Sequence, residues 1–180
     1  MAPEPHLTLR RAVETDSAVI AALHIAAWQW AYRGQLRDAL LDGLTVQIDR
    51  RTARRREQLV RLSSPERTWV AEAAGQIVGF ADTGLSRDAD AAPDTAELYA
   101  IYLARDAVGK GIGRTLLAHA LGDLRGRGYR AATLWVLTTN ARARRFYEAA
   151  GWRPDGTTKT VQLAADVDLN ELRYHIDLKR

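Results

Sequence analysis

The stretch VGKGIGRTLLAHAL (Val108–Leu121) alternates three glycines with other residues and then runs directly into a strong helical pattern. Glycine inside a helix costs roughly 1 kcal/mol relative to alanine, so glycines at a helix start need another reason. A helix N-terminus presents unpaired N–H groups and the positive end of the helix dipole, and glycine lets a ligand approach the backbone closely. The stretch therefore predicts a phosphate-binding loop, with a flexible turn that caps the helix as the alternative.

Two common phosphate motifs do not fit this loop. A dinucleotide fingerprint G-x-G-x-x-G that starts at Gly109 would need a glycine where Arg114 stands. A Walker loop would need the sequence G-K-[ST] after four intervening residues, which is missing from this stretch. The glycine spacing alone thus predicts an anion site without naming its ligand.

A second motif, NARARRFYEAAGW (Asn140–Trp152), follows an apolar, β-prone run and ends in glycine and an aromatic residue. Together the two motifs resemble those of the GNAT superfamily of acyl-CoA-dependent N-acetyltransferases, whose signatures are [QR]-x-x-G-x-[GA] and N-x-x-A-x-x-F-Y-x-x-x-G-[FW]. Gly111 and Gly113 match the first signature, and every fixed position of the second is present. Val108 is the departure, because the family usually has arginine or glutamine there.

The patterning on either side predicts a single mixed α/β domain over residues 1–180. The expected strands are Leu7–Arg10, Thr68–Ala73, Ile77–Leu85, Glu97–Leu103, Ala131–Leu137, Thr160–Leu163 and Glu171–Leu178. The expected helices are one that is capped by Thr15 or Asp16, then Val46–Leu62, Gly113–Arg125 and Asn140–Ala150, with Leu36–Thr45 as a loop or short turn. The order agrees with the family fold, which implies a mostly antiparallel central sheet, flanking helices and two splayed parallel strands at the centre.

The resemblance also implies where acetyl-CoA, the acyl donor, is bound. The loop N–H groups would hold its pyrophosphate, and the pantetheine arm would pair with a strand as an added strand does. The implied binding residues are Ile101, Tyr102, Leu103, Val108, Gly109, Lys110, Gly111, Ile112, Gly113, Arg114, Asn140 and Arg144. Asn140 has a simpler alternative as a helix cap, and the arginines have one as solvent-exposed charges.

Two residues are candidates for the proton transfers of acetyl transfer. Tyr147 matches the family tyrosine that protonates the departing thiolate, and its alternative is an aromatic that packs the helix beside Phe146. Glu97 is the candidate general base, directly or through water, and its alternative is a glutamate exposed at the edge of the sheet.

The amine acceptor site has weaker signals. His24, Trp28 and Tyr32 recur every four residues along one helical stripe, which indicates either an acceptor pocket or ordinary core packing. His24 is a second candidate base. The expected partner is a small-molecule or peptide amine, its identity is not encoded in these motifs, and a homodimer is left open.

Composition excludes several other classes. The chain has no cysteine, so a disulfide, a thiolate nucleophile and a Cys-rich zinc site are excluded, and no metal is expected. Met1–His6 lacks the basic segment and apolar core of a secretion signal, so a cytoplasmic protein without a membrane partner is expected. The net charge is +4, but the arginine cluster Arg50–Arg56 has no interleaved aromatics, so no nucleic-acid partner is expected. The main functional alternative is a non-catalytic CoA-binding sensor or interaction module.

Overall fold

The predicted order of helices and strands is present in the computed structural model, which describes residues 7–61, 65–164 and 167–178. The chain divides into two units. The first comprises Met1–Asp82 and Ala100–Ala120, and the second comprises Thr83–Tyr99 and Leu121–Arg180. The single domain over residues 1–180 stays a prediction.

The described residues form a seven-stranded sheet in the order β1-β2-β3-β4-β5-β7-β6. Its strands are β1 (Leu7–Arg11), β2 (Arg67–Ala73), β3 (Gln76–Leu85), β4 (Thr95–Leu103), β5 (Ala131–Leu137), β6 (Arg153–Ala164) and β7 (Val167–Asp177). β4 and β5 are parallel, whereas β1 and β2, β5 and β7, and β6 and β7 are antiparallel. This confirms the predicted mixed sheet with a parallel pair at its centre.

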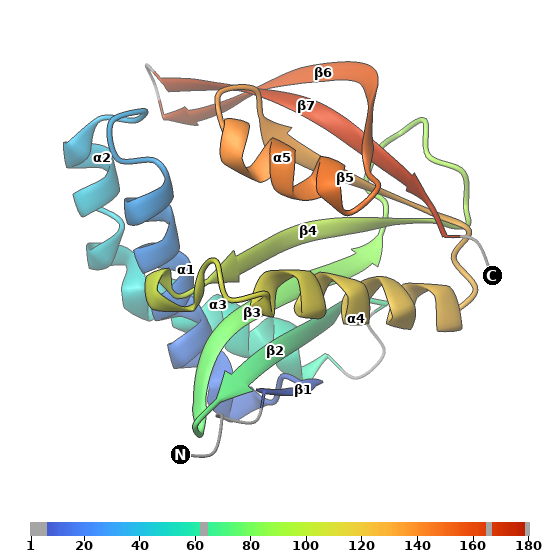
Figure 1. Ribbon diagram of the computed structural model, residues 1–180. Coiled ribbons are helices and arrows are strands. Elements are labelled where there is room, and N and C mark those ends of the chain that lie inside the picture. The colour runs from blue at the N-terminus through green and yellow to red at the C-terminus, as the bar shows by residue number, and fades with distance from the viewer. Residues whose placement is uncertain (1–6, 62–64, 165–166, 179–180) are drawn as a thin grey trace. The chain divides into compact units, whose positions relative to one another are not determined.

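In the first unit, helices cover both faces of the sheet (Figure 1). Val70 of β2 packs in an apolar core with Ile20 and Leu23 of α1 (Ser17–Ala31). The preceding residue, Trp69, instead stacks edge-on with His119 of α4 (Ile112–Gly126), at a ring separation of 4.3 Å. Because successive side chains of a strand point to opposite faces, α1 and α4 lie on opposite sides of β2.

The second unit carries α5 (Ala141–Ala149) against the sheet formed by β5, β7 and β6 (Figure 1). Trp152, which follows α5, and Tyr174 of β7 are fully buried. The β6–β7 hairpin is longer than predicted, because its first residues include Pro154 and Gly156, which resemble a turn. A register shift between Pro154 and Thr158 accommodates them within β6.

The α1–α3 connection also differs from the prediction. Residues 36–45, expected as a loop or short turn, contain the short helix α2 (Asp38–Asp42). α3 covers Ile48–Val60 rather than Val46–Leu62, because Val46 lies in a separate 3-10 turn. Leu62 lies outside the described residues. No helix in the described part of the chain is both long and apolar enough to span a membrane.

Candidate active site

The glycine loop lies between β4 and α4 in the first unit. Gly109 and Gly111 have φ angles of 82° and 81°, in the left-handed region that L side chains rarely adopt. A Cβ atom added at either position would meet nothing within 4 Å. The glycines are therefore required by the backbone conformation and not by protein packing, and the space beside the loop is open to a ligand.

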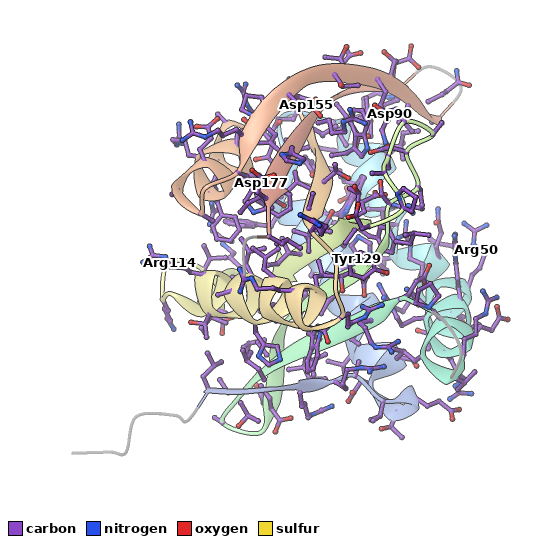
Figure 2. All side chains as sticks on the ribbon, turned by 90° about the vertical axis from the view of Figure 1, so that its right-hand side faces the viewer. Arg50, Asp90, Arg114, Tyr129, Asp155 and Asp177 are labelled. Atoms are coloured by element: carbon purple, nitrogen blue, oxygen red, sulfur yellow. The ribbon has the colours of Figure 1, made fainter. Side chains whose placement is uncertain are left out.

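The loop ends at the N-terminus of α4. The backbone N–H of Thr115 donates to the carbonyl of Gly111 at 3.1 Å, which makes Gly111 the residue just before the helix. The N–H groups of Ile112, Gly113 and Arg114 thus belong to the first turn, where no intrahelical carbonyl precedes them. Lys110 and Arg114 are exposed, and Figure 2 shows Arg114 at this end of α4. This geometry suits an anion with several oxygen acceptors.

The end of β4 offers a strand edge next to this loop. The N–H of Ala104 donates to the carbonyl of Val78 in β3 at 2.8 Å. Because backbone groups alternate along a strand, those of Leu103 and Ile101 point away from β3. Among the described residues, the parallel ladder with β5 runs from Thr95↔Ala131 to Glu97↔Thr133, and therefore does not include them. An extended ligand could pair with this edge as an added strand does.

Glu97 is buried on β4, with 3% of its surface exposed, so the alternative of an exposed edge glutamate is wrong. The structure adds Arg87, which the sequence did not indicate. The Arg87 guanidinium donates to Oε1 at 2.7 Å and to Oε2 at 3.3 Å, and its backbone N–H donates to Oε2 at 3.0 Å. The guanidinium is mostly exposed, at 66%, and lies over the ring of Tyr99. Glu97 can act as a direct base only when Arg87 moves aside.

Tyr147 and Asn140 lie at opposite ends of α5. Tyr147 is buried and contacts the rings of Phe146, Trp152 and Tyr174 at centroid separations of 5.3, 6.2 and 6.4 Å. The Asn140 side chain accepts a hydrogen bond from the Ala143 N–H at 3.0 Å, which confirms its role as helix cap. The helix cap is thus sufficient to explain an asparagine at position 140. Tyr147 packs against other rings and also stands at the motif position of the candidate proton donor.

Arg144 has partners within the protein. Its Nε donates to the Tyr174 hydroxyl at 3.2 Å and its Nη1 to the Thr138 carbonyl at 3.2 Å. The Tyr174 hydroxyl in turn donates to Glu148 at 2.6 Å. The hydrogen bond to Tyr174 raises the pKa of Arg144, while burial raises the pKa of Tyr174. Arg144 therefore ties α5 to β7 in this structure, and Tyr174 is a partner that the sequence motif did not reveal.

The predicted aromatic stripe forms a cluster with β4. We call His24, Trp28, Tyr32 and Tyr102 the aromatic cluster. The His24 and Tyr102 rings lie 4.6 Å apart, the Trp28 and Tyr32 rings 4.9 Å apart, and the Trp28 Nε1–H donates to the Tyr102 hydroxyl at 2.8 Å. Burial, followed by the charges of Arg55 and Arg51, lowers the pKa of His24 to about 4. His24 is therefore neutral at neutral pH and holds a proton poorly, which disfavours it as the base.

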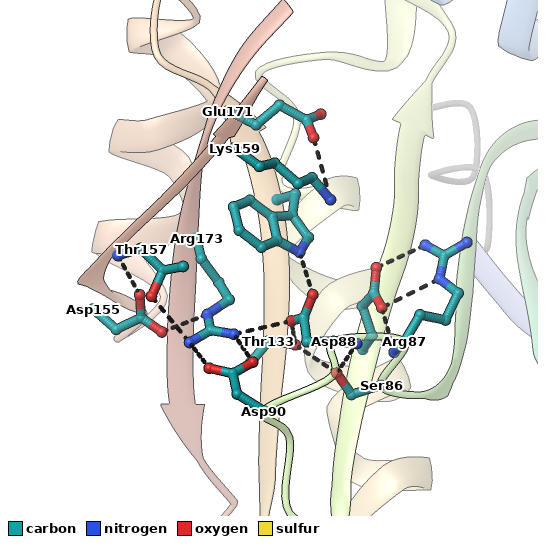
Figure 3. Close-up of polar contacts among 12 residues, drawn as sticks. Ser86, Arg87, Asp88, Asp90, Thr133, Asp155, Thr157, Lys159, Glu171 and Arg173 are labelled. Carbon is teal, nitrogen blue, oxygen red and sulfur yellow. Dashed lines mark hydrogen bonds and ion pairs between the residues drawn. The ribbon is translucent and has the colours of Figure 1, made fainter. Parts of the chain in front are cut away.

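The connection between β3 and β4, predicted as a polar segment, is fixed by a charged network (Figure 3). Arg173 of β7 donates to Asp90 at 2.6 and 2.8 Å, to Asp155 at 2.7 Å and to Asp88 at 3.4 Å. Asp88 also accepts from the Trp135 Nε1–H at 2.9 Å. The network fixes the residues that flank Arg87, and so supports the Arg87–Glu97 pair.

The predicted residues are thus distributed over both units. The first unit holds the loop, the strand edge and the aromatic cluster, and the second holds Glu97, Tyr147, Asn140 and Arg144. Across the described residues, no three His, Asp or Glu side chains are grouped so as to hold a metal ion.

Comparisons with known proteins find relatives of similar sequence and of similar fold. A probable N-acetyltransferase of Mycobacterium tuberculosis is 28% identical over 178 residues, which is 95% of this chain and 94% of that protein. The fold is similar to that of the paia N-acetyltransferase from Thermoplasma acidophilum, solved in complex with coenzyme A, with a TM-score of 0.77 and 19% identity over 96% of this chain and 99% of that one. It is also similar to yncA from Salmonella typhimurium, solved with its cofactor acetyl-CoA, with a TM-score of 0.71 and 23% identity over 97% and 95%.

The family profile described as the acetyltransferase (GNAT) family matches residues 24–152. The match includes the glycine loop, β4, α5 and the whole of the aromatic cluster. Because it covers well over half of the sequence, the chain belongs to the GNAT family of acetyltransferases.

Proposed function

We propose that this protein transfers the acetyl group of acetyl-CoA directly to the nitrogen of a primary amine on a small molecule or peptide. The observation that carries the proposal is the open glycine loop at the N-terminus of α4, next to a strand edge at Ile101 and Leu103. The loop and the first turn of α4 would bind the phosphates, with charge added by Lys110 and Arg114. The strand edge would bind the extended pantetheine arm.

The chemistry that bound acetyl-CoA supplies is an activated thioester. In the transfer a C–N bond forms to the acceptor and the C–S bond breaks, while one proton leaves the amine and one reaches the sulfur. Glu97 would accept the amine proton through water, because Arg87 occupies both of its oxygens in the resting structure. Tyr147 would donate the proton to sulfur, and a backbone N–H of the β4 edge would stabilise the developing oxyanion.

The test is a panel of primary amines incubated with acetyl-CoA, with free CoA thiol and acetylated amine measured together. Equal amounts of thiol and N-acetylated product, in excess of the thiol released without amine, are expected. A CoA-binding module without catalysis would instead bind acetyl-CoA, as seen by a rise in melting temperature, and release no thiol with any amine. Thiol release without acetylated amine would show hydrolysis and contradict the proposed acceptor.

A further inference from the structure

The arginine-rich helix α3 contains Arg51, whose hydrogen bonding differs from that of the arginines near it. Arg55 donates to both oxygens of Asp82 at 2.8 Å, Arg56 pairs with Glu14 at 3.4 Å, and Arg50 donates to Gln47 at 2.9 Å. Arg51 is half-buried, and its Nε is fully buried and has no hydrogen-bond partner in the part of the chain that the structure describes. A buried donor on a charged group that lacks a partner is costly, so an anion that pairs with the rest of this guanidinium would stabilise it.

Among the residues that the structure describes, no carboxylate pairs with Arg51. The pKa of Arg51 is lowered by burial first and then by the nearby charges of Arg50 and Arg54. Asp82, a buried carboxylate in the same unit, is already bound by Arg55 and by the Thr68 hydroxyl at 2.6 Å. The net local charge is therefore positive, and an anion would be attracted to it.

The aromatic cluster is near this charge, because α3, which carries Arg51, packs against α1, which carries His24 and Trp28. The charge of Arg51 acts on His24, where it helps to keep the imidazole neutral, and it interacts with the Tyr102 phenol. Trp28, His24 and Tyr102 are only half-buried, so they offer apolar ring surface beside the cation. A polyamine would be repelled here, whereas an anion on an organic body would gain both charge pairing and ring contact.

We propose that Arg51 binds a carboxylate of the acceptor against the aromatic cluster, so that the acceptors are amines that also carry a carboxylate, as amino acids do. This inference rests on the proposed acetyl transfer and narrows its substrate class.

The test compares amines that share a skeleton and differ in the carboxylate. Phenylalanine, phenylalanine amide and phenethylamine are assayed by thiol release with wild-type protein, Arg51→Met and Arg50→Met. Arg50 is an exposed arginine one position earlier on α3 and serves as the matched control (Figure 2). We expect wild type to prefer phenylalanine, Arg51→Met to lower its kcat/KM by about 10-fold or more while sparing phenethylamine, and Arg50→Met to change neither.

A second measurement does not depend on turnover. Phenylacetate has the ring and the carboxylate but no amine, and it should raise the melting temperature of wild type and of Arg50→Met but not of Arg51→Met. Arg51→Met itself should be at least as thermostable as wild type, because it removes a half-buried charge without a partner. A marked loss of thermostability would show that Arg51 serves the fold, and would contradict the proposal.

The outcomes separate the two proposals. Phenylacetate binding that depends on Arg51, without acetylation of any amine, would support the carboxylate site and contradict acetyl transfer. Acetylation that treats the three amines alike, without phenylacetate binding, would support transfer and overturn the role of Arg51. A loss of CoA affinity in Arg51→Met would assign Arg51 to the CoA phosphates instead, which would also overturn the proposal.

Discussion

Tyr102 belongs both to the predicted CoA-binding residues and to the aromatic cluster, which it joins in the structure. Its neighbours Ile101 and Leu103 form the strand edge proposed for the pantetheine arm, and its phenol accepts the hydrogen bond from Trp28. The family resemblance placed Tyr102 among the CoA-binding residues, but no pattern in the sequence connected Tyr102 with Trp28. The two residues are 74 positions apart, and only the packing of α1 on the sheet brings them together.

His24 should make the stability of the protein depend on pH. Its pKa falls from 6.5 to about 4 on folding, so between these values the unfolded state binds more protons. The neutral His24 therefore adds to the unfolding free energy. This addition is complete above pH 6.5 and is lost as the pH falls toward 4. His24→Phe keeps a ring against Tyr102 but cannot titrate. Between pH 7 and 4.5, wild type should lose roughly 2 kcal/mol more unfolding free energy than the variant in denaturant titrations. Parallel pH profiles of the two proteins would contradict this assignment.

Tyr147 is tested by deleting only its hydroxyl. Tyr147→Phe keeps the ring contacts with Phe146, Trp152 and Tyr174 and should lower kcat by about 10²-fold, the usual scale for one acid–base group. CoA affinity and folding should be almost unchanged. Tyr129→Phe, in the turn after α4, is the matched control and should keep its kcat (Figure 2). If Tyr147→Phe retained the wild-type kcat where chemistry limits the rate, Tyr147 would be a packing residue.

At the scale of helices and strands, the sequence predicts those elements whose ends are determined by nearby residues. The strands and helices of the two motifs are close to their predicted bounds, because glycines, caps and periodic apolar residues mark their ends. The β6–β7 hairpin was predicted too short, because Pro154 and Gly156 are typical of turns, whereas β6 includes both and shifts its register between Pro154 and Thr158. α2 was missed because five residues are too few to show a helical period.

The cap of α5 gives a prediction for a single element. Asn140→Ala removes the acceptor for the Ala143 N–H and should lower the unfolding free energy by about 1 kcal/mol. Asn140→Asp retains a side-chain oxygen at the cap and should stay close to wild type in stability. Chemical denaturation of the three proteins measures both effects. Equal losses in the two variants would show that the cap bond does not stabilise α5.

At the scale of the whole molecule, long-range ion pairs decide features that no local pattern encodes. The contacts of Arg173 with Asp88 and Asp90 join residues 85 and 83 positions apart, and the pairing of Arg87 with Glu97 joins the β3–β4 connection to β4. The sequence contains 26 basic and 22 acidic side chains, so many pairings are available and composition does not select among them. The candidate base was therefore predicted without the arginine that covers it, and no pattern in the sequence indicated that Arg51 belongs to the acceptor site that we propose.

The Arg173 network gives a prediction at this scale. The Arg173 side chain is only 11% exposed and contacts Asp88, Asp90 and Asp155. Arg173→Met would leave these carboxylates without their shared cation and should cost roughly 3 kcal/mol of unfolding free energy. The control is Arg130→Met. The Arg130 side chain is 84% exposed and contacts Asp94 at 3.8 Å, so its loss should lower the unfolding free energy by about 1 kcal/mol or less. A cost for Arg173→Met as small as that of the control would contradict a structural role for the network.

The central claim is that the glycine loop binds the phosphates of acetyl-CoA. Calorimetric titration of CoA tests it most directly, with three proteins compared: wild type, Gly111→Val and Gly128→Val. Gly111 and Gly128 have φ angles of 81° and 92°, and a Cβ at either would meet nothing within 4 Å, so the conformational strain is matched. They lie at opposite ends of α4. Both variants should lose similar stability, and only Gly111→Val should weaken CoA binding, by about 10-fold or more. Full CoA affinity in folded Gly111→Val, or an equal loss in Gly128→Val, would contradict the account.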